Sequence, residues 1–220
     1  MPRLEVKAPI LVVAGDLSTH QFVRKELIDL AERWEHVLFV PGNHEYYGNT
    51  LELFDYMELP GNVHLLNRAN VLIEDVTFIG ATLWTDFCGD PMAQFAAARG
   101  IADFRAIRNF SPAQCAELHR KHRQYLKFAY EHTEGKRVII THFLPSPRCT
   151  HPRYGTTNLL NKYFAPDLTE WIESLEDTTW LFGHTHDRMQ LQIGNTKLYA
   201  NPRGYPNENE QPYEALGIEV

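Results

Sequence analysis

Four short apolar runs along the chain are each followed directly by polar residues that can bind a metal. The runs are rich in Val, Ile, Leu and Phe and span residues 10–14, 37–40, 137–140 and 179–182. Short runs of this kind are typical of buried strands, which can be apolar on both faces. The residues that follow them are Gly15-Asp16, Gly42-Asn43-His44-Glu45, Thr141-His142 and Gly183-His184-Thr185-His186. Because open α/β sheets bind ligands at the carboxyl ends of their strands, the pattern predicts a metal site there.

The remaining apolar positions predict further helices and short strands. Helical spacing is found at residues 20–33, 50–59 and 92–102, and Ser111-Pro112 is typical of the start of a long helix, which we expect to reach about Glu134. Short strands are expected at 63–66, 71–73, 77–81, 189–193, 197–200 and 215–219, with Gly194-Asn195 as a hairpin turn. The alternation of strands and helices in the first third predicts parallel βαβ units.

Composition and charge narrow the class of protein. A chain of 220 residues with 44% hydrophobic residues can bury one sizeable core, so residues 1–220 are expected to form a single domain. The net charge of −7 and the lack of a Lys/Arg cluster argue against an extended nucleic-acid surface. Three cysteines without a CxxC pair, no membrane-spanning run and no apolar signal region lead us to expect a cytoplasmic protein with reduced thiols.

Taken singly, the polar residues after the strands have ordinary structural explanations. Asp16 precedes a helical segment and could simply cap it, and His142 could be a hydrogen-bonded core histidine. His184 and His186 are stronger evidence, because alternate residues of an extended segment share one face and would point into the same cavity. The four motifs together favour the metal site over these explanations.

The motifs GD, GNHE, TH and GHTH, in this order, resemble those of the calcineurin-like metallophosphoesterase superfamily. The similarity runs from about Ile10 to the end of the chain, and the segment Asn201-Pro202-Arg203-Gly204-Tyr205 resembles bacterial and phage members. The resemblance implies an α/β fold, a four-layer α/β/β/α sandwich of two mixed sheets flanked by helices. Residues 84–110 form a polar and aromatic insertion, which we expect to be a lid or wall over the site.

The resemblance also assigns a role to each motif residue. It implies that one metal is bound by Asp16, Asn43, His142 and His184, that Asp16 bridges to a second metal bound by His186, and that His44 protonates the leaving oxygen. It implies substrate contact by His44 and Arg203, and Asp187 could orient a ligand ring. Further candidates for substrate contact are Arg105, Arg108, Arg153, Tyr154 and Tyr46.

One motif of the superfamily is absent from the sequence. Its members normally open with a strand ending in Asp-x-His, whereas residues 1–9 here contain neither Asp nor His. We therefore expect the first family strand to be missing, one metal to bind firmly, and a second to be weak or absent unless His20 or His151 substitutes. A missing strand would also leave an open sheet edge, which favours a homodimer.

The expected activity is hydrolysis of a phosphodiester or small phosphomonoester by a metal-activated hydroxide. Nitrogen and oxygen ligands suit Mn²⁺, which we prefer, and also Fe, Zn²⁺, Ni²⁺ or Co²⁺. Two alternatives stay open. The first is a catalytically weakened, single-metal phosphate-binding or regulatory protein, and the second is a nuclease, against which the acidic charge counts.

Overall fold

The first of two sheets is small and parallel. The computed structural model describes residues 4–155, 158–205 and 213–220. Strands β1 (Ile10–Ala14), β2 (His36–Val40) and β3 (Val63–Leu65) form a three-stranded sheet in that order, with both pairings parallel. Helix α1 (Val23–Ala31) connects β1 to β2 and buries Val23, Leu27 and Leu30. β1 lies at one edge of this sheet, and no described strand pairs with its outer side.

The second sheet is larger and mixed. Its strands are β4 (Ala69–Ile73), β5 (Val76–Ala81), β6 (Lys136–Thr141), β7 (Thr178–Phe182), β8 (Met189–Ile193) and β9 (Thr196–Ala200), in the order β4-β5-β6-β7-β9-β8. The four central strands are parallel, whereas β4 and β8 pair antiparallel with their neighbours. The predicted hairpin turn at Gly194-Asn195 is confirmed, with Gly194 at a φ of 58°.

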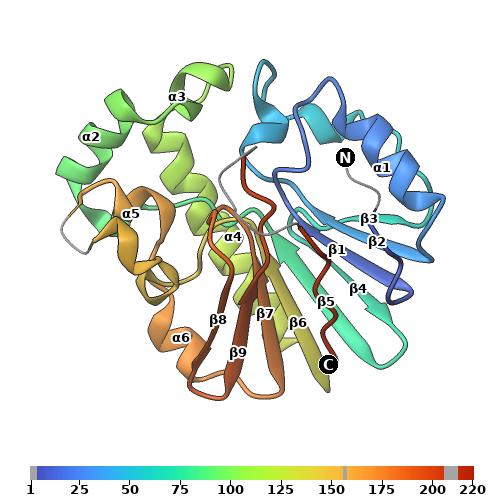
Figure 1. Cartoon of the computed structure of the whole chain (residues 1–220). Coiled ribbons are helices and arrows are strands. Elements are labelled where there is room, and N and C mark those ends of the chain that lie inside the picture. Colours follow the sequence, from blue (N-terminus) through green and yellow to red (C-terminus); the bar gives the residue numbers. More distant parts are fainter. Residues whose placement is uncertain (1–3, 156–157, 206–212) are drawn as a thin grey trace.

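Helices cover the outer faces of the two sheets and complete four layers (Figure 1). The long helix α4 (Pro112–Glu131) packs behind β5, and Ser111 caps it by accepting a hydrogen bond from the Gln114 N–H. The shorter helices are α2 (Pro91–Gly100), α3 (Asp103–Ala106), α5 (Asn161–Phe164) and α6 (Thr169–Glu173). The α/β/β/α sandwich is confirmed, with the refinement that only the larger of the two sheets is mixed.

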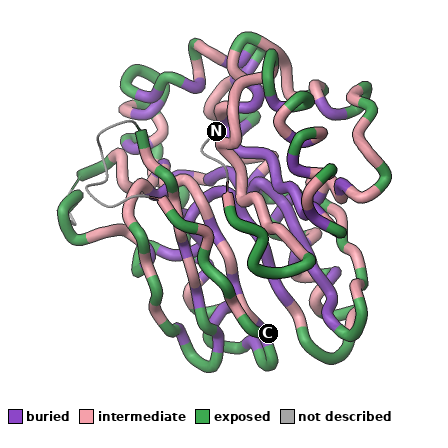
Figure 2. Tube along the Cα trace, turned by 45° about the vertical axis from the view of Figure 1, so that its right-hand side comes forward, coloured by how far each residue is buried: buried purple, intermediate pink, exposed green. Residues whose placement is uncertain are grey.

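The space between the sheets is filled by alternate residues of each strand. Leu38 and Val40 of β2 pack with Phe78 of β5 and Ile140 of β6, while Phe39 belongs to the larger core cluster that includes the α1 residues. This period of two follows from the pleat, because successive side chains of a strand point to opposite faces. The central strands are therefore buried on both sides, as Figure 2 shows.

Two predicted elements are wrong. Residues 50–59 contain only a short 3₁₀ turn, Leu53–Asp55, and only Phe54 of this turn is buried. One buried side chain offers little to offset the cost of starting a helix. Residues 213–220 form no strand. Two side chains hold this segment instead: Asn201 Nδ2 donates to the Glu214 carbonyl, and Lys136 Nζ donates to the backbone oxygen of Val220.

In the described part of the chain, no helix combines the length and apolar character needed to span a bilayer.

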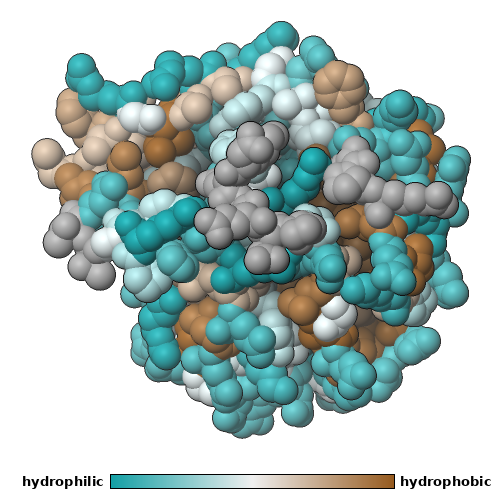
Figure 3. Space-filling model, in the orientation of Figure 1, coloured by the Kyte–Doolittle hydropathy of each residue, from teal (hydrophilic) through white to brown (hydrophobic). Residues whose placement is uncertain are grey.

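The 84–110 insertion lies in the β5–β6 connection, at the end of the molecule to which these parallel strands point (Figure 1). It contains the 3₁₀ turn Phe87–Gly89 and helices α2 and α3. Figure 3 shows apolar atoms over the lobe of α2 and α5, where Met92 and Phe95 are among the exposed large hydrophobic residues. Helix α2 of the insertion therefore presents apolar side chains at the surface.

Two buried histidines of α4 hold the start of this insertion. His122 Nδ1 accepts a hydrogen bond from the Leu83 N–H (3.0 Å), and His119 Nδ1 lies 3.1 Å from the Leu83 carbonyl. Leu83 and Trp84 both have positive φ, a strained conformation for such side chains. Burial lowers the pKa of His122 to about 3, with help from the positive charge of Arg68, so this ring is neutral in the folded protein.

We expect this histidine to make stability depend on pH. The unfolded chain binds a proton on His122 below about pH 6.5 and the folded chain does not, so stability falls as the pH drops from 6.5 toward 3. Between pH 7 and pH 5 the loss is about 2 kcal/mol from this residue. Urea unfolding of the native sequence and of His122→Asn at both pH values checks this. An equal loss in both proteins would contradict it.

Candidate metal centre

The centre of the site is His142, at the carboxyl end of β6, and its side chain is fully buried. The strand register aligns Ala14 with Val40 and Thr141 with Phe182, so the loops after β1, β2, β6 and β7 meet at one end of the two sheets. The Nδ1–H of His142 donates to the Ala14 carbonyl across a distance of 2.8 Å. In the neutral ring this bond places the proton on Nδ1, so that the Nε2 lone pair is free to bind a metal.

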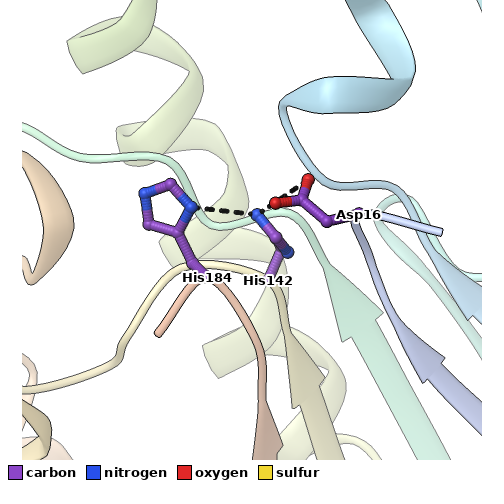
Figure 4. A group of neighbouring side chains, drawn as sticks. All are labelled: Asp16, His142 and His184. Carbon is purple, nitrogen blue, oxygen red and sulfur yellow. Dashed lines mark hydrogen bonds and ion pairs between the residues drawn. The ribbon is translucent and has the colours of Figure 1, made fainter. Parts of the chain in front are cut away.

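Three further ligand atoms face this nitrogen. His142 Nε2 lies 3.0 Å from Asn43 Oδ1, 3.1 Å from His184 Nδ1 and 3.4 Å from Asp16 Oδ1. Figure 4 shows the rings of His142 and His184 and the carboxylate of Asp16 turned toward one another. Lone pairs brought this close together repel unless a cation or a proton lies among them. The arrangement therefore fits a bound cation.

His184 is held as a neutral ligand. Burial lowers its pKa well below the ordinary value, and the neighbouring His142, His44 and His186 lower it further. Its ring stacks on Phe143, with centroids 4.2 Å apart, and its backbone has a φ of 61°. Its Nε2 is buried, with no hydrogen-bond partner among the described residues. A neutral imidazole with one nitrogen in the cluster is suited to a divalent transition metal.

Asp16 is positioned by Glu45 and not by a helix. The helix α1 begins only at Val23, so Asp16 does not cap it. The fully buried Glu45 carboxylate accepts hydrogen bonds from the backbone N–H groups of Asp16, Ser18 and Gly42, with the Asp16 bond at 3.0 Å. Burial and the nearby Asp16 raise the pKa of Glu45 to about 8. Glu45 belongs to the GNHE motif, but its position there carries no signal for this role.

Two glycines allow the loops to approach His142 closely. Gly15 has a φ of 82°, and a Cβ atom there would lie 2.3 Å from His142 Nδ1. A Cβ atom on Gly42 would lie 2.3 Å from Asp16 Oδ1 and 2.7 Å from His142 Cε1. No real Cβ contact is this short, so any larger residue would push the ligand loops apart.

His44 and His186 are partly exposed and lie beside two tyrosines. The His44 ring stacks on Tyr47, with centroids 4.5 Å apart, and its backbone N–H donates to Asp16 Oδ1 (3.1 Å). His186 contacts Tyr205 edge to face at 4.7 Å between centroids, and Tyr205 also lies 6.3 Å from His44. Among the described residues, the group of His, Cys, Asp and Glu that could hold a metal consists of Asp16, His142 and His184, without His186.

The other predicted contacts are distributed around this cluster. Asp187 pairs with Arg153 (3.0 Å) and lies 4.0 Å from His151, and Arg153 also donates to the Tyr154 hydroxyl. Arg203 is exposed and lies near Tyr213, where its charge and that of Arg188 partly offset the rise in the Tyr213 pKa that burial causes.

Several candidates are engaged elsewhere. Tyr46 is buried against Phe54 and Trp84, which removes it from the residues that could contact substrate. The Arg105 guanidinium donates to the Arg99 carbonyl. The backbone N–H of Arg108 donates to the Asn49 carbonyl, and substrate contact by its side chain stays a prediction. His20 Nδ1 hydrogen-bonds the Tyr47 carbonyl instead of joining the cluster.

One buried residue of the site carried no signal in the sequence. Asp103, in the insertion, is 1% exposed and its carboxylate contacts the side chain of Asn43. It follows no strand and belongs to no recognised motif, and it is separated from Asn43 by 60 positions. Only the fold brings the two residues together.

The sequence and the fold are both similar to those of known proteins. The family model described as calcineurin-like phosphoesterase matches residues 3–188. An uncharacterized protein, L509, of Acanthamoeba polyphaga mimivirus is 23% identical over 239 residues, covering 95% of this chain and 84% of the viral protein. The crystal structure of phosphopantetheinyl hydrolase (PptH) from Mycobacterium tuberculosis has the same fold, with a TM-score of 0.77 and 18% identity over 96% of this chain and 86% of that one. The chain therefore belongs to the calcineurin-like phosphoesterase family.

Proposed function

We propose that this protein hydrolyses a phosphodiester or a small phosphomonoester with the help of a bound divalent metal ion. Membership of the family supports metal-dependent hydrolysis of phosphate esters in general. The observation that carries the proposal is the convergence of Asn43, His184 and Asp16 on Nε2 of His142. These nitrogen and oxygen atoms come from four loops and together form a ligand set for one cation.

The residues of the proposed site have two roles: several would hold the metal, and His44 would donate a proton. Asp16, Asn43, His142 and His184 would hold the ion, and His186 would serve a second one. When bound, a divalent metal supplies an acidified water and stabilises negative charge on the phosphate oxygens. His44 lies outside the converging group and is partly exposed, so its ring can reach a leaving oxygen and donate a proton to it.

The geometry favours one firmly bound metal and a second that is weak or absent. Asp16, His142 and His184 form the described metal-binding group, while His186 lies beside Tyr205. Mn²⁺ is our preferred ion, because carboxylate and amide oxygens are hard ligands. A metal-binding group without His186 also favours a second candidate function. This is a phosphate-binding or regulatory protein that retains a single metal and hydrolyses phosphate esters slowly.

A small substrate fits the surroundings of the site better than a long nucleic acid. The net charge of −7 disfavours binding of an extended phosphate backbone. Near the GHTH loop, Arg153 is already paired with Asp187. Tyr47 and Tyr205 flank His44 and offer aromatic surface to a neighbouring organic group. A phosphoester with one compact organic substituent satisfies these features.

The proposal is tested by assaying bis-p-nitrophenyl phosphate and p-nitrophenyl phosphate after loading with Mn²⁺, Zn²⁺, Ni²⁺ or Co²⁺. Single- and double-stranded DNA and RNA are assayed in parallel. We expect turnover of at least one small ester that depends on the metal and stops with EDTA. Metal binding without turnover would favour the phosphate-binding candidate, and cleavage of long nucleic acids would favour a nuclease.

A further inference from the structure

The side-chain amide of Asn43 ends in an oxygen atom and an NH₂ group, and only the oxygen can bind a cation. The amide oxygen is a metal ligand, whereas the NH₂ group at the other end carries partial positive charge and repels a cation. Rotation by 180° about the last side-chain bond exchanges them. A functional metal centre therefore needs something that fixes the orientation of this amide.

Asp103 of helix α3 meets this need. Its Oδ1 accepts a hydrogen bond from Asn43 Nδ2 at 2.9 Å, and Asn43 Oδ1 then points the other way, 3.0 Å from His142 Nε2. A carboxylate can only accept, so the side of Asn43 that faces Asp103 must be the NH₂ group. The chemistry of the partner thus decides the orientation.

The Asp103 carboxylate is itself held in place by two tyrosines. Its Oδ1 also accepts from the Tyr47 hydroxyl at 2.6 Å, and its Oδ2 accepts from the Tyr163 hydroxyl. Burial raises the pKa of both phenols, and the negative charge of Asp103 raises them further, so both remain donors. With Asn43 this makes three donors to one buried carboxylate, enough to offset part of its desolvation.

The insertion that carries Asp103 is fastened to the Asn43 loop by the backbone as well. The Gly48 N–H donates to the Ala106 carbonyl at 2.7 Å, and the Arg108 N–H donates to the Asn49 carbonyl at 2.8 Å. These bonds lie on either side of the end of α3 and keep it against residues 43–49. The backbone bonds therefore hold Asp103 in a fixed position beside Asn43. A mobile lid would not hold it there.

We propose that Asp103 is a positioning residue of the metal centre, which turns the carbonyl oxygen of Asn43 toward the cation through a hydrogen bond to its NH₂ group. The inference rests on the proposed function and gives the 84–110 insertion a role inside the site. It also predicts that Asp103 acts through Asn43 and through no other ligand.

A double-mutant cycle tests this by isothermal titration with Mn²⁺ and by the absorption spectrum of the Co²⁺-loaded protein. Asp103→Ala is expected to weaken Mn²⁺ binding by about 10- to 100-fold and to alter the Co²⁺ spectrum. In the Asn43→Ala background the same change is expected to cost less than about threefold. Asp90→Ala is the matched control, because Asp90 caps α2 in the same insertion and pairs with Lys162, and it should leave both readouts unchanged.

Each contrary outcome has a distinct meaning. If Asp103→Ala weakens binding equally in both backgrounds, or if Asp90→Ala has the same effect, Asp103 only supports the fold and the inference is overturned. If the protein with the native sequence binds no Mn²⁺ at all, the metal centre and the proposed function fail with it. Circular dichroism establishes that each variant is folded. Asp103→Leu, which has a side chain of similar size and cannot accept a hydrogen bond, replaces Asp103→Ala with the same expected result if the latter does not fold.

Discussion

His142→Ala is expected to abolish both metal retention and phosphoesterase turnover. The residue contributes the nitrogen on which Asn43, His184 and Asp16 converge, and its bond to the Ala14 carbonyl ties the loop after β6 to the end of β1. Loss of a partner that only orients a ligand costs about 10- to 100-fold in metal affinity, and loss of the central ligand should cost more. Elemental analysis after Mn²⁺ loading and desalting, together with turnover of bis-p-nitrophenyl phosphate, measures both effects.

His64→Ala is the matched control for this prediction. His64 lies in β3 and pairs with His36 on the neighbouring strand, apart from the four ligand loops. This variant should retain metal and activity. Because His142 is buried, urea unfolding must show that the variant is folded, and His184→Ala provides a second ligand variant. Retention of metal by both folded ligand variants would show that the ion binds elsewhere.

His44→Ala is expected to keep the metal and lose turnover, most severely for esters with poor leaving groups. A positioned general acid contributes about 10²- to 10⁴-fold to such a step. Its help matters little when the leaving group is already a stable anion, so the loss should grow as the leaving phenol becomes a weaker acid. Initial rates on a series of aryl phosphodiesters give this dependence. A loss of the same size across the whole series would contradict proton donation by His44.

Local signals made much of the site predictable from the sequence. Each ligand motif directly follows a short apolar strand, so the pattern around Asp16, Asn43, His142 and His184 placed them at strand ends without any knowledge of the topology. The parallel pairing of these strands then brings the motifs together. The roles of Arg203 and His186 stay predictions, because they depend on a substrate and on a second metal.

What the sequence did not reveal depends on contacts between distant segments. The bond between Asp103 and Asn43 joins residues 60 positions apart, and the hydrogen bonds from Asp16 and Ser18 to Glu45 join two separate loops. Neither contact has a periodic pattern. Residues 50–59 have helical spacing, but Phe54 is the single buried side chain of the turn Leu53–Asp55. Tertiary packing outweighs local propensity in such a segment.

The central claim is that four loops build one firm metal site, and metal stoichiometry tests it most directly. The protein is loaded with Mn²⁺, desalted and analysed for bound metal beside His184→Ala. We predict about one retained Mn²⁺ for each chain of native sequence and none for the variant, because loss of a ligand nitrogen opens the site. If the native protein retains no Mn²⁺, or if His184→Ala retains as much Mn²⁺ per chain as the native protein, the account is contradicted.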